Sequence, residues 1–206
     1  NKPCNVVVVG AGTAGLEAAC TAAEVGCKVT LLEKEKEAGG LSVEISKIPA
    51  KKRLADFPTY LKYRASKLPN LTIKTGVDAT VAEIKKYNPD LVVNATGSVP
   101  LLPPIEGLHD NLGKKEASVY SIKDMIADVK NYPEDMTGKK VVVVGGGAVG
   151  LDVVEFFAPR GAETTIIEMM PVIGNGLDAS STSSMKECME KHHVRQMTNT
   201  ALQKVN

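Results

Sequence analysis

The sequence contains one unusual junction twice: a run of four valines that passes directly into a glycine-rich turn. The first copy reads VVVVGAGTAGLEAAC from Val6, and the second reads VVVVGGGAVGLDVVEFF from Val141. A short, continuous run of β-branched residues is typical of a strand that is buried on both faces of a parallel sheet. Glycine directly after such a strand allows a tight turn into a helix. The chain is therefore expected to fold as an α/β protein.

The two copies align without gaps at an offset of 135 residues, which pairs residues 6–33 with residues 141–168. Twelve of these 28 positions are identical, among them the valines, three glycines and a final glutamate. Only two copies occur, at a domain-sized separation, so the pattern indicates a duplicated functional unit rather than a solenoid. We expect two Rossmann-like parallel-sheet units with three layers, the second of them incomplete.

Each copy carries the motif G-x-G-x-x-G between the expected strand and the expected helix. In this motif the first glycine allows the turn, the second lets a diphosphate approach the backbone, and the third lets the helix pack closely on the strand. The unpaired N–H groups at the start of the helix then face the phosphates. Each copy also ends its second strand with an acid, Glu33 or Glu168, placed to accept hydrogen bonds from a ribose. The sequence thus predicts two dinucleotide-binding turns.

Strands and helices around the first turn are expected from the apolar runs. A helix is expected over Leu16–Val25, closed by Gly26, and a strand over Lys28–Leu32. Further strands are expected over Leu71–Lys74 and Leu91–Asn94.

Other helix signals lie outside the repeat. Leu54, Phe57, Leu61 and Leu68 recur at helical spacing, with Asp56 placed to cap that helix.

The middle and second half of the chain contain residues that start or end regular structure. Residues 97–107 are rich in proline and glycine and are expected to be a linker without regular structure. Ser121 and Asp124 resemble a capping box at the start of a helix that runs through Val129. Pro159 falls where the helix after the second turn should continue, so that helix is expected to end or kink early.

Two more stretches carry a resemblance to a known family. Gly39-Gly40-Leu41 follows the first acid, and residues 89–107 contain a strand that ends in Ala95-Thr96-Gly97 before spaced prolines. With the two turns, these stretches resemble the two-dinucleotide-binding flavoprotein reductases, in which an FAD domain is interrupted by an NAD(P)H domain. The segment GGLSVEISKIP and the lack of a C-x-x-C pair are more similar to the C-terminal portion of the NADH:flavin oxidoreductase/2,4-dienoyl-CoA reductase family than to the disulfide reductases.

The resemblance implies a division of labour along the chain. Residues 1–112 would form the first segment of an FAD- or ADP-binding domain, and residues 113–206 an NAD(H)-binding domain truncated at its C-terminus. Hydride would pass from NADH to FAD and electrons onward to FMN and a 4Fe-4S cluster, both expected only in a missing upstream part, for an enoate or dienoyl-CoA-type reduction. No catalytic side chain is expected, because hydride passes between the cofactors themselves. The fragment alone is expected to be inactive and to bind FAD weakly.

Residues of the two turns, the two acids and the second FAD motif are the expected cofactor contacts. At the first site these are Gly10, Ala11, Gly12, Thr13, Ala14, Gly15, Glu33, Lys34, Gly40, Leu41, Val77, Ala95, Thr96 and Gly97. At the second site they are Gly145, Gly147, Ala148, Val149, Gly150 and Glu168.

Two other functions stay open at this point. The chain also resembles the corresponding part of the trimethylamine dehydrogenase type, which holds only ADP, as a structural ligand. It also resembles a glutamate-synthase-type electron-input subunit, which shares the Gly-Gly-Leu context. Beside its nucleotide cofactors, the expected partner is the remainder of the parent enzyme, and an oligomer is compatible with the sequence.

Composition excludes several other classes of function. The 25 basic and 24 acidic residues nearly balance, which gives no reason to expect a nucleic acid or a membrane partner. The four cysteines fit no disulfide framework or metal site, and the pair His192–His193 is interpreted as a solvated helix end. No metal ligand is therefore assigned, and free thiols indicate a reducing, cytoplasmic location.

Overall fold

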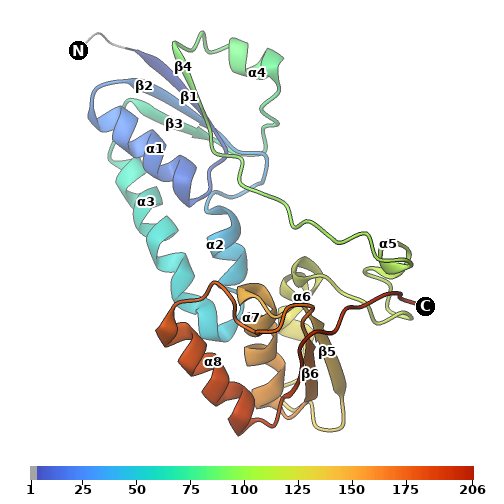
Figure 1. Cartoon of the computed structure of the whole chain (residues 1–206). Coiled ribbons are helices and arrows are strands. Elements are labelled where there is room, and N and C mark those ends of the chain that lie inside the picture. Colours follow the sequence, from blue (N-terminus) through green and yellow to red (C-terminus); the bar gives the residue numbers. More distant parts are fainter. Residues whose placement is uncertain (1–3) are drawn as a thin grey trace. The chain divides into compact units, whose positions relative to one another are not determined.

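The computed structural model describes residues 4–206. The chain forms two compact units that divide between Leu101 and Leu102, inside the segment expected to be a linker. Residues 97–105 contain no helix or strand, as expected, and the trace after β4 runs through them without regular structure (Figure 1). The assignment of residues 1–112 and 113–206 to two cofactor domains remains a prediction.

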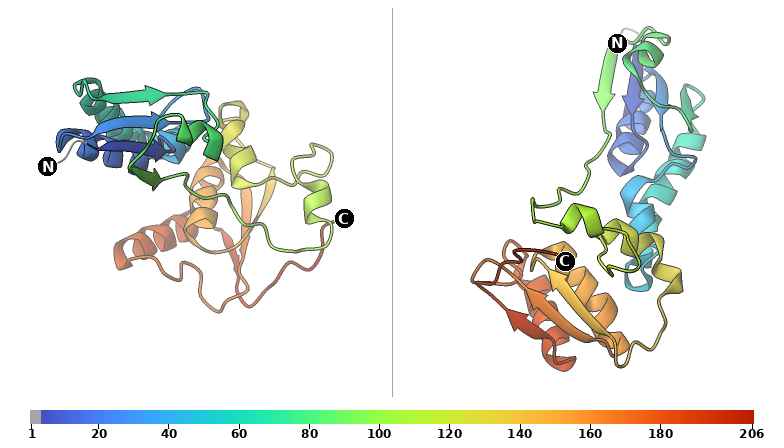
Figure 2. Two further views of the ribbon diagram at one scale, coloured as in Figure 1. Left: turned by 90° about the horizontal axis from the view of Figure 1, so that it is seen from above. Right: turned by 90° about the vertical axis from the view of Figure 1, so that its right-hand side faces the viewer.

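The first unit is built on a four-stranded parallel sheet in the order β3-β2-β1-β4. The strands are β1 (Asn5–Val9), β2 (Lys28–Leu32), β3 (Leu71–Lys74) and β4 (Leu91–Asn94). The helical segments are α1 (Thr13–Glu24), α2 (Gly40–Ile45), the 3-10 helix η1 (Pro49–Ala55), α3 (Asp56–Ser66) and α4 (Val81–Lys85). Figure 2 shows the strands of this unit side by side, with helices packed along them.

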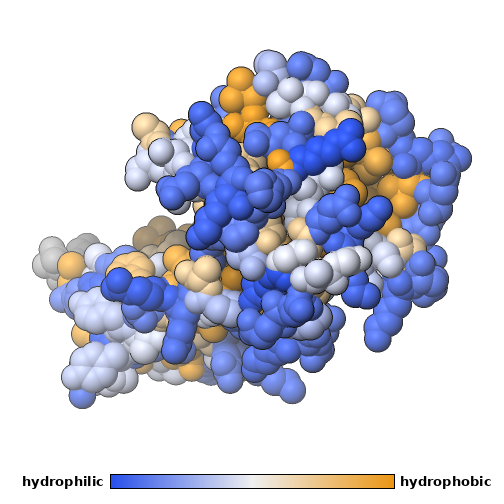
Figure 3. Space-filling model, turned by 90° about the horizontal axis from the view of Figure 1, so that it is seen from below, coloured by the Kyte–Doolittle hydropathy of each residue, from blue (hydrophilic) through white to orange (hydrophobic). Residues whose placement is uncertain are grey.

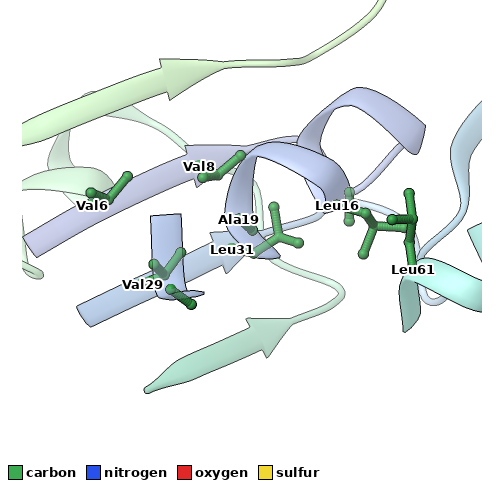
Figure 4. Packing of buried hydrophobic residues seen from close by; sticks show 9 residues of the cluster. Val6, Val8, Leu16, Ala19, Val29, Leu31 and Leu61 are labelled. Atoms are coloured by element: carbon green, nitrogen blue, oxygen red, sulfur yellow. The ribbon is translucent and has the colours of Figure 1, made fainter. Parts of the chain in front are cut away.

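The core of the first unit lies between the sheet and helix α1. Leu16, Ala19 and Ala23 recur at the helical spacing that places them on one face of α1, and all three are buried. They pack with valine and leucine side chains of β1 and β2 and with Leu61 of α3 (Figure 4). The burial of β1 confirms that its valine run is a central strand, covered on both faces.

The second unit contains a three-stranded parallel sheet in the order β5-β6-β7. The strands are β5 (Lys140–Val144), β6 (Glu163–Ile167) and β7 (Arg195–Met197). The helical segments are α5 (Leu108–Asn111), α6 (Ile122–Ala127), η2 (Val129–Asn131), α7 (Ala148–Phe157), η3 (Ala158–Arg160) and α8 (Ala179–Lys191). The two parallel sheets confirm the α/β fold class with Rossmann-like units.

Local signals in the second unit have the expected effects. The α-helical part of α7 ends at Phe157, and Pro159 lies in the short 3-10 turn that follows. Ser121 and Asp124 form the capping box reciprocally, although helix α6 ends at Ala127 and a 3-10 turn continues the chain. The apolar face of α7 packs on Val143 and Ile166 of the sheet.

Three expectations for the first unit were wrong in detail. Asp56 is the first residue of α3 and not its cap; Ala55 holds the cap position without a side-chain hydrogen bond, because η1 runs directly into α3. Leu54 and Phe57 are exposed, so the buried face of α3 consists of Pro58, Leu61 and Ala65. Helix α1 begins at Thr13, earlier than expected from its leucine and alanine pattern.

One face of the surface is mostly polar. Figure 3 shows hydrophilic residues over most of one face, with apolar residues in smaller groups between them. Within residues 4–206, no helix has the length and apolar character needed to span a bilayer. Over the same residues, no group of three or more histidine, cysteine or acidic side chains is arranged to hold a metal ion.

Candidate functional site

The first turn joins β1 to α1 and is closed by backbone contacts. Gly10 has a φ of +96°, and its N–H donates to the carbonyl of Leu32 at 2.8 Å. A Cβ at Gly10 would lie 2.4 Å from the carbonyl oxygen of Ala95, and one at Gly15 would lie 1.8 Å from the carbonyl oxygen of Gly10. Gly10 therefore requires glycine for both conformation and space, and Gly15 requires it for space alone.

The second turn has the same construction. Gly145 has a φ of +103° and donates its N–H to the carbonyl of Ile167 at 2.9 Å. A Cβ at Gly150 would lie 1.9 Å from the carbonyl oxygen of Gly145. The third glycine of each motif thus lets the helix lie close to the first glycine, whereas a Cβ at Gly145 itself would meet no atom within 4 Å.

The middle glycine of each motif caps the following helix. Gly12 and Gly147 have extended backbone conformations and no side chain to bond the first helical amides of α1 and α7. A Cβ at Gly12 would find only the Cα of Gly40 at 3.9 Å, and none lies within 4 Å at Gly147. The space next to both helix starts is therefore open to a ligand, and the amides and helix dipole favour an anion there.

Both predicted acids reach back to their own turn. Glu33 accepts a hydrogen bond from the N–H of Ala11 at 2.6 Å and another from Glu35 at 2.9 Å. Glu168 accepts from Gly146 at 2.6 Å and from Met170 at 2.7 Å. The backbone N–H groups of Met170 and Gly146 lower the pKa of Glu168, so this carboxylate is charged at neutral pH.

Val77 and Lys34 were both predicted to contact the cofactor near Glu33, but only Val77 lies against the acid. The N–H of Val77 donates to the carbonyl of Glu33 at 2.9 Å, which places its backbone beside the acid. The Lys34 side chain points outward and is 74% exposed, 4.0 Å from Glu35. Val77 therefore lies with the site residues, while Lys34 is at its solvent edge.

The Ala-Thr-Gly segment lies at the end of β4, next to the first turn. Ala95 donates its N–H to the carbonyl of Val9 at 2.8 Å, continuing the β1–β4 pairing. Asn94 Oδ1 accepts from Thr96 Oγ1 at 2.9 Å, and Gly97 has a φ of +73°. The structure thus brings Ala95 against Gly10, and Thr96 and Gly97 follow directly.

The Gly39–Gly40 pair holds a second loop against the first turn. Gly39 donates its N–H to the carbonyl of Ala11 at 2.8 Å and forms an isolated bridge with Gly12. A Cβ at Gly40 would lie 2.7 Å from the Cα of Gly12, so the two backbones touch. Leu41, the next predicted contact, is 57% exposed.

The second unit contains an equivalent loop that sequence reasoning missed. Gly174 donates its N–H to the carbonyl of Gly146 at 2.7 Å. The same offset of 135 residues relates Gly39 to Gly174 and Ala11 to Gly146. Extending the alignment beyond residue 33 would have found this glycine, because it is identical in both copies.

The surroundings of the second turn are more exposed to solvent than those of the first turn. Ala148 and Val149 are exposed at the start of α7. In the first unit β4 pairs with β1, whereas the sheet of the second unit, over the described residues, ends at β5. Val142 and Val144 of β5 are 62% and 51% exposed.

A cavity of about 290 Å³ lies elsewhere in the second unit. It is lined by side chains of α7, α8 and β7, among them Leu151, Met185 and Met189. None of Gly145, Gly147, Gly150 and Glu168 lines it. The turn itself, with its exposed helix start, remains the better candidate for nucleotide binding.

Comparison with known proteins agrees with this geometry. The family model of the pyridine nucleotide-disulphide oxidoreductases matches residues 5–206. An NADH oxidase of Thermoanaerobacter brockii is 35% identical over 186 residues, which are 90% of this chain and 27% of that protein. A cinnamate reductase of Clostridium sporogenes is 37% identical over 166 residues, 80% of this chain and 23% of the relative.

A solved structure of 2-naphthoyl-CoA reductase in complex with 2-naphthoyl-CoA superposes with a TM-score of 0.80 and 30% identity. The match covers 100% of this chain and 29% of that one. The chain therefore spans only about a quarter of the length of these relatives. With a family model matched over almost its whole length, the chain belongs to the pyridine nucleotide-disulphide oxidoreductase family.

Proposed function

We propose that the chain is the dinucleotide-binding part of a flavin-dependent oxidoreductase that uses NADH. The first unit would hold FAD and the second NADH, with electrons continuing to an FMN and 4Fe-4S part of the whole protein. The observation that carries this proposal is the pair of matched turns, each closed by a carboxylate that accepts from the turn backbone.

The residues at the first turn fit the ADP portion of FAD. Gly12 leaves the helix start open, and Glu33 lies where it can accept from a ribose hydroxyl. The backbone groups of Val77 and Ala95 lie beside the same turn. FAD, when bound, supplies a ring that accepts hydride and releases electrons one at a time.

At the second turn, the chain's own task is to bind and orient the dinucleotide. Amides at the start of α7 would face the diphosphate, and the charged Glu168 would accept from the ribose. We assign no side chain to proton transfer, because the bound nicotinamide and flavin would supply the hydride chemistry themselves.

The cinnamate reductase and the 2-naphthoyl-CoA reductase among the similar proteins support a reductase of unsaturated substrates. Cinnamate is an enoate, and 2-naphthoyl-CoA is a CoA thioester of an aromatic acid. We propose that the whole protein reduces a substrate of the enoate or dienoyl-CoA type.

The test is anaerobic reduction of the flavins by NADH in the whole protein. Gly147→Val should leave the flavin content unchanged and slow the loss of the flavin absorption band, because only the second turn is blocked. Gly12→Val should lower the FAD content itself. If the whole protein contains ADP in place of FAD and neither variant changes reduction by NADH, the nucleotide is structural and the proposal is wrong.

A further inference from the structure

The first turn carries a pair of hydroxyls that the second turn lacks. Thr13 Oγ1 and Ser42 Oγ are 3.0 Å apart and partly buried, and either oxygen can be the donor. Thr13 is the first residue of α1, next to the open space at Gly12, and Ser42 belongs to α2. The pair therefore lies at the edge of the space assigned to the diphosphate.

The glycine loop explains why Ser42 is so close. Gly39 is bonded to Ala11, and Gly40 touches Gly12, so the start of α2 is fixed against the turn. Ser42 follows two residues later, on the side of α2 that faces Thr13. Its place depends on backbone contacts and not on a mobile loop.

The internal repeat gives a natural comparison. The offset of 135 residues relates Thr13 to Ala148 and Ser42 to Leu177. Gly174 fixes the equivalent loop on the second turn, yet Ala148 is exposed and Leu177 packs on the apolar core. The glycine hydrogen bond to the turn is thus present in both copies, whereas the hydroxyl pair belongs to the first turn alone.

The hydroxyl pair has one hydrogen that it can donate to a ligand. Two hydroxyls carry two hydrogens, and the bond between them uses one. When Ser42 donates to Thr13, the Thr13 hydrogen is left for an acceptor in the open space beside Gly12. A phosphate oxygen is such an acceptor, and its negative charge makes this bond a strong one.

We propose that Ser42 is a positioning residue for the first site, which holds the Thr13 hydroxyl toward the dinucleotide phosphate that lies farther from adenosine. This inference rests on the proposed function of the first turn. Glu33 bonds Ala11 at one end of the turn, so the adenosine side lies there. The diphosphate then crosses Gly12 toward Thr13, which brings its second phosphate to the hydroxyl pair.

The test is calorimetric titration of the 206-residue chain with ADP and with AMP, which lacks the second phosphate. Thr13→Ala should weaken ADP binding about tenfold and leave AMP binding unchanged, as expected for one hydrogen bond to a charged group. Ser42→Ala should weaken ADP binding about threefold, and Ser42→Thr, which keeps a hydroxyl, should restore it. The double variant should be no weaker than Thr13→Ala, because Ser42 acts through Thr13.

Ser66→Ala is the matched control, since the Ser66 hydroxyl donates to the carbonyl of Tyr63 within α3. An equal loss for ADP and AMP, a lower melting temperature without a change in their affinity ratio, or strictly additive losses would each overturn the role of Ser42. Gly12→Val separates the two proposals: if it leaves ADP binding intact, the first-site assignment itself fails.

Discussion

Glu33 and Glu168 have the same relationship to their turns: one carboxylate oxygen of each accepts a 2.6 Å hydrogen bond from the backbone N–H that follows the first glycine of the motif. The other oxygen accepts from the residue two positions further along the chain. Each carboxylate is thereby oriented by the backbone before any nucleotide arrives. A ribose therefore meets a fixed acceptor, and little side-chain entropy is lost on binding.

The first prediction concerns the choice of nicotinamide cofactor. Glu168 is charged and oriented, and the 2′-phosphate of NADPH would meet it as a like charge. Met169 and Met170 follow it and offer no cation. In titrations of the whole protein, NADH should bind about tenfold more tightly than NADPH. Glu168→Ala should narrow that difference, and tighter binding of NADPH by the parent would contradict the assignment.

The pH dependence of this preference follows from the lowered pKa of Glu168. Its carboxylate stays charged as the pH falls from 8 to 6, so any weakening of the repulsion in that range comes from protonation of the 2′-phosphate and not of Glu168. Because folding lowers the pKa of Glu168, its ionised carboxylate stabilises the fold above the pKa that it has in the unfolded chain. This stabilisation is lost as the pH falls through the pKa of the folded state.

The second prediction tests the diphosphate position at the first turn. Gly12→Val should fold, because a Cβ there meets only Gly40 at 3.9 Å and the backbone conformation suits any residue. The valine should fill the space beside the helix start and weaken ADP binding at least about tenfold. Gly147→Val is the matched control, which leaves the first turn unchanged. Normal ADP affinity in Gly12→Val, with an unchanged melting temperature, would disprove the site.

Much of the fold was predictable because its signals are local. The strand bounds Lys28–Leu32, Leu71–Lys74 and Leu91–Asn94 follow from apolar runs between turn residues, and the structure has the same bounds. Pro159 also acts through its own backbone. Signals of this kind need no knowledge of distant residues.

The errors arise where distant residues decide the outcome. Leu54 and Phe57 have the helical spacing of a core, but the sheet and α1 reach only the face of α3 that carries Leu61. The contact between Ser42 and Thr13 could not be predicted either, because it depends on how Gly39 and Gly40 fold back onto the turn. Sequence gives the residues of such a site, but not which of them meet.

The third prediction concerns a charge cluster that ties α1 to α3. Arg64 bonds Glu24 at 2.6 Å and Glu17 at 2.8 Å, and its side chain is only 21% exposed. Hydrogen bonds from Arg64 lower the pKa of both glutamates. Arg64→Met should therefore lower the melting temperature at pH 7, where both acids are charged.

The pH profile distinguishes this cluster from simple packing. Because both pKa values are lowered, the stabilisation is present above the pKa of unfolded glutamate, about 4.3, and is lost as the pH falls through the folded values. The difference in melting temperature between parent and Arg64→Met should thus shrink below about pH 4. Lys62→Met, at an exposed position of α3, is the control. A constant difference at all pH values would mean that Arg64 acts by packing alone.

The last prediction concerns two thiols at the starts of neighbouring strands. Cys4 precedes β1 and Cys27 precedes β2, and the carbonyl of Cys4 accepts a 2.9 Å hydrogen bond from the N–H of Lys28. A hydrogen bond with the Cys27 thiol raises the pKa of Cys4, with smaller contributions from burial and from the charge of Asp90. The reactive thiolate of Cys4 is therefore scarce at pH 8.

Alkylation by iodoacetamide, followed residue by residue with mass spectrometry, measures this effect. Cys27→Ala should speed the labelling of Cys4 at pH 8 about twofold or more, because removing the thiol partner lowers the pKa of Cys4. The gain should shrink as the pH is raised further, because the Cys4 thiol then ionises in the parent as well. Cys20 is the internal control: it is buried against Leu61 and should stay unlabelled in parent and variant alike. Equal labelling of Cys4 with and without Cys27 would show that the two thiols do not interact, whereas labelling of Cys20 would show that the variant has opened the core.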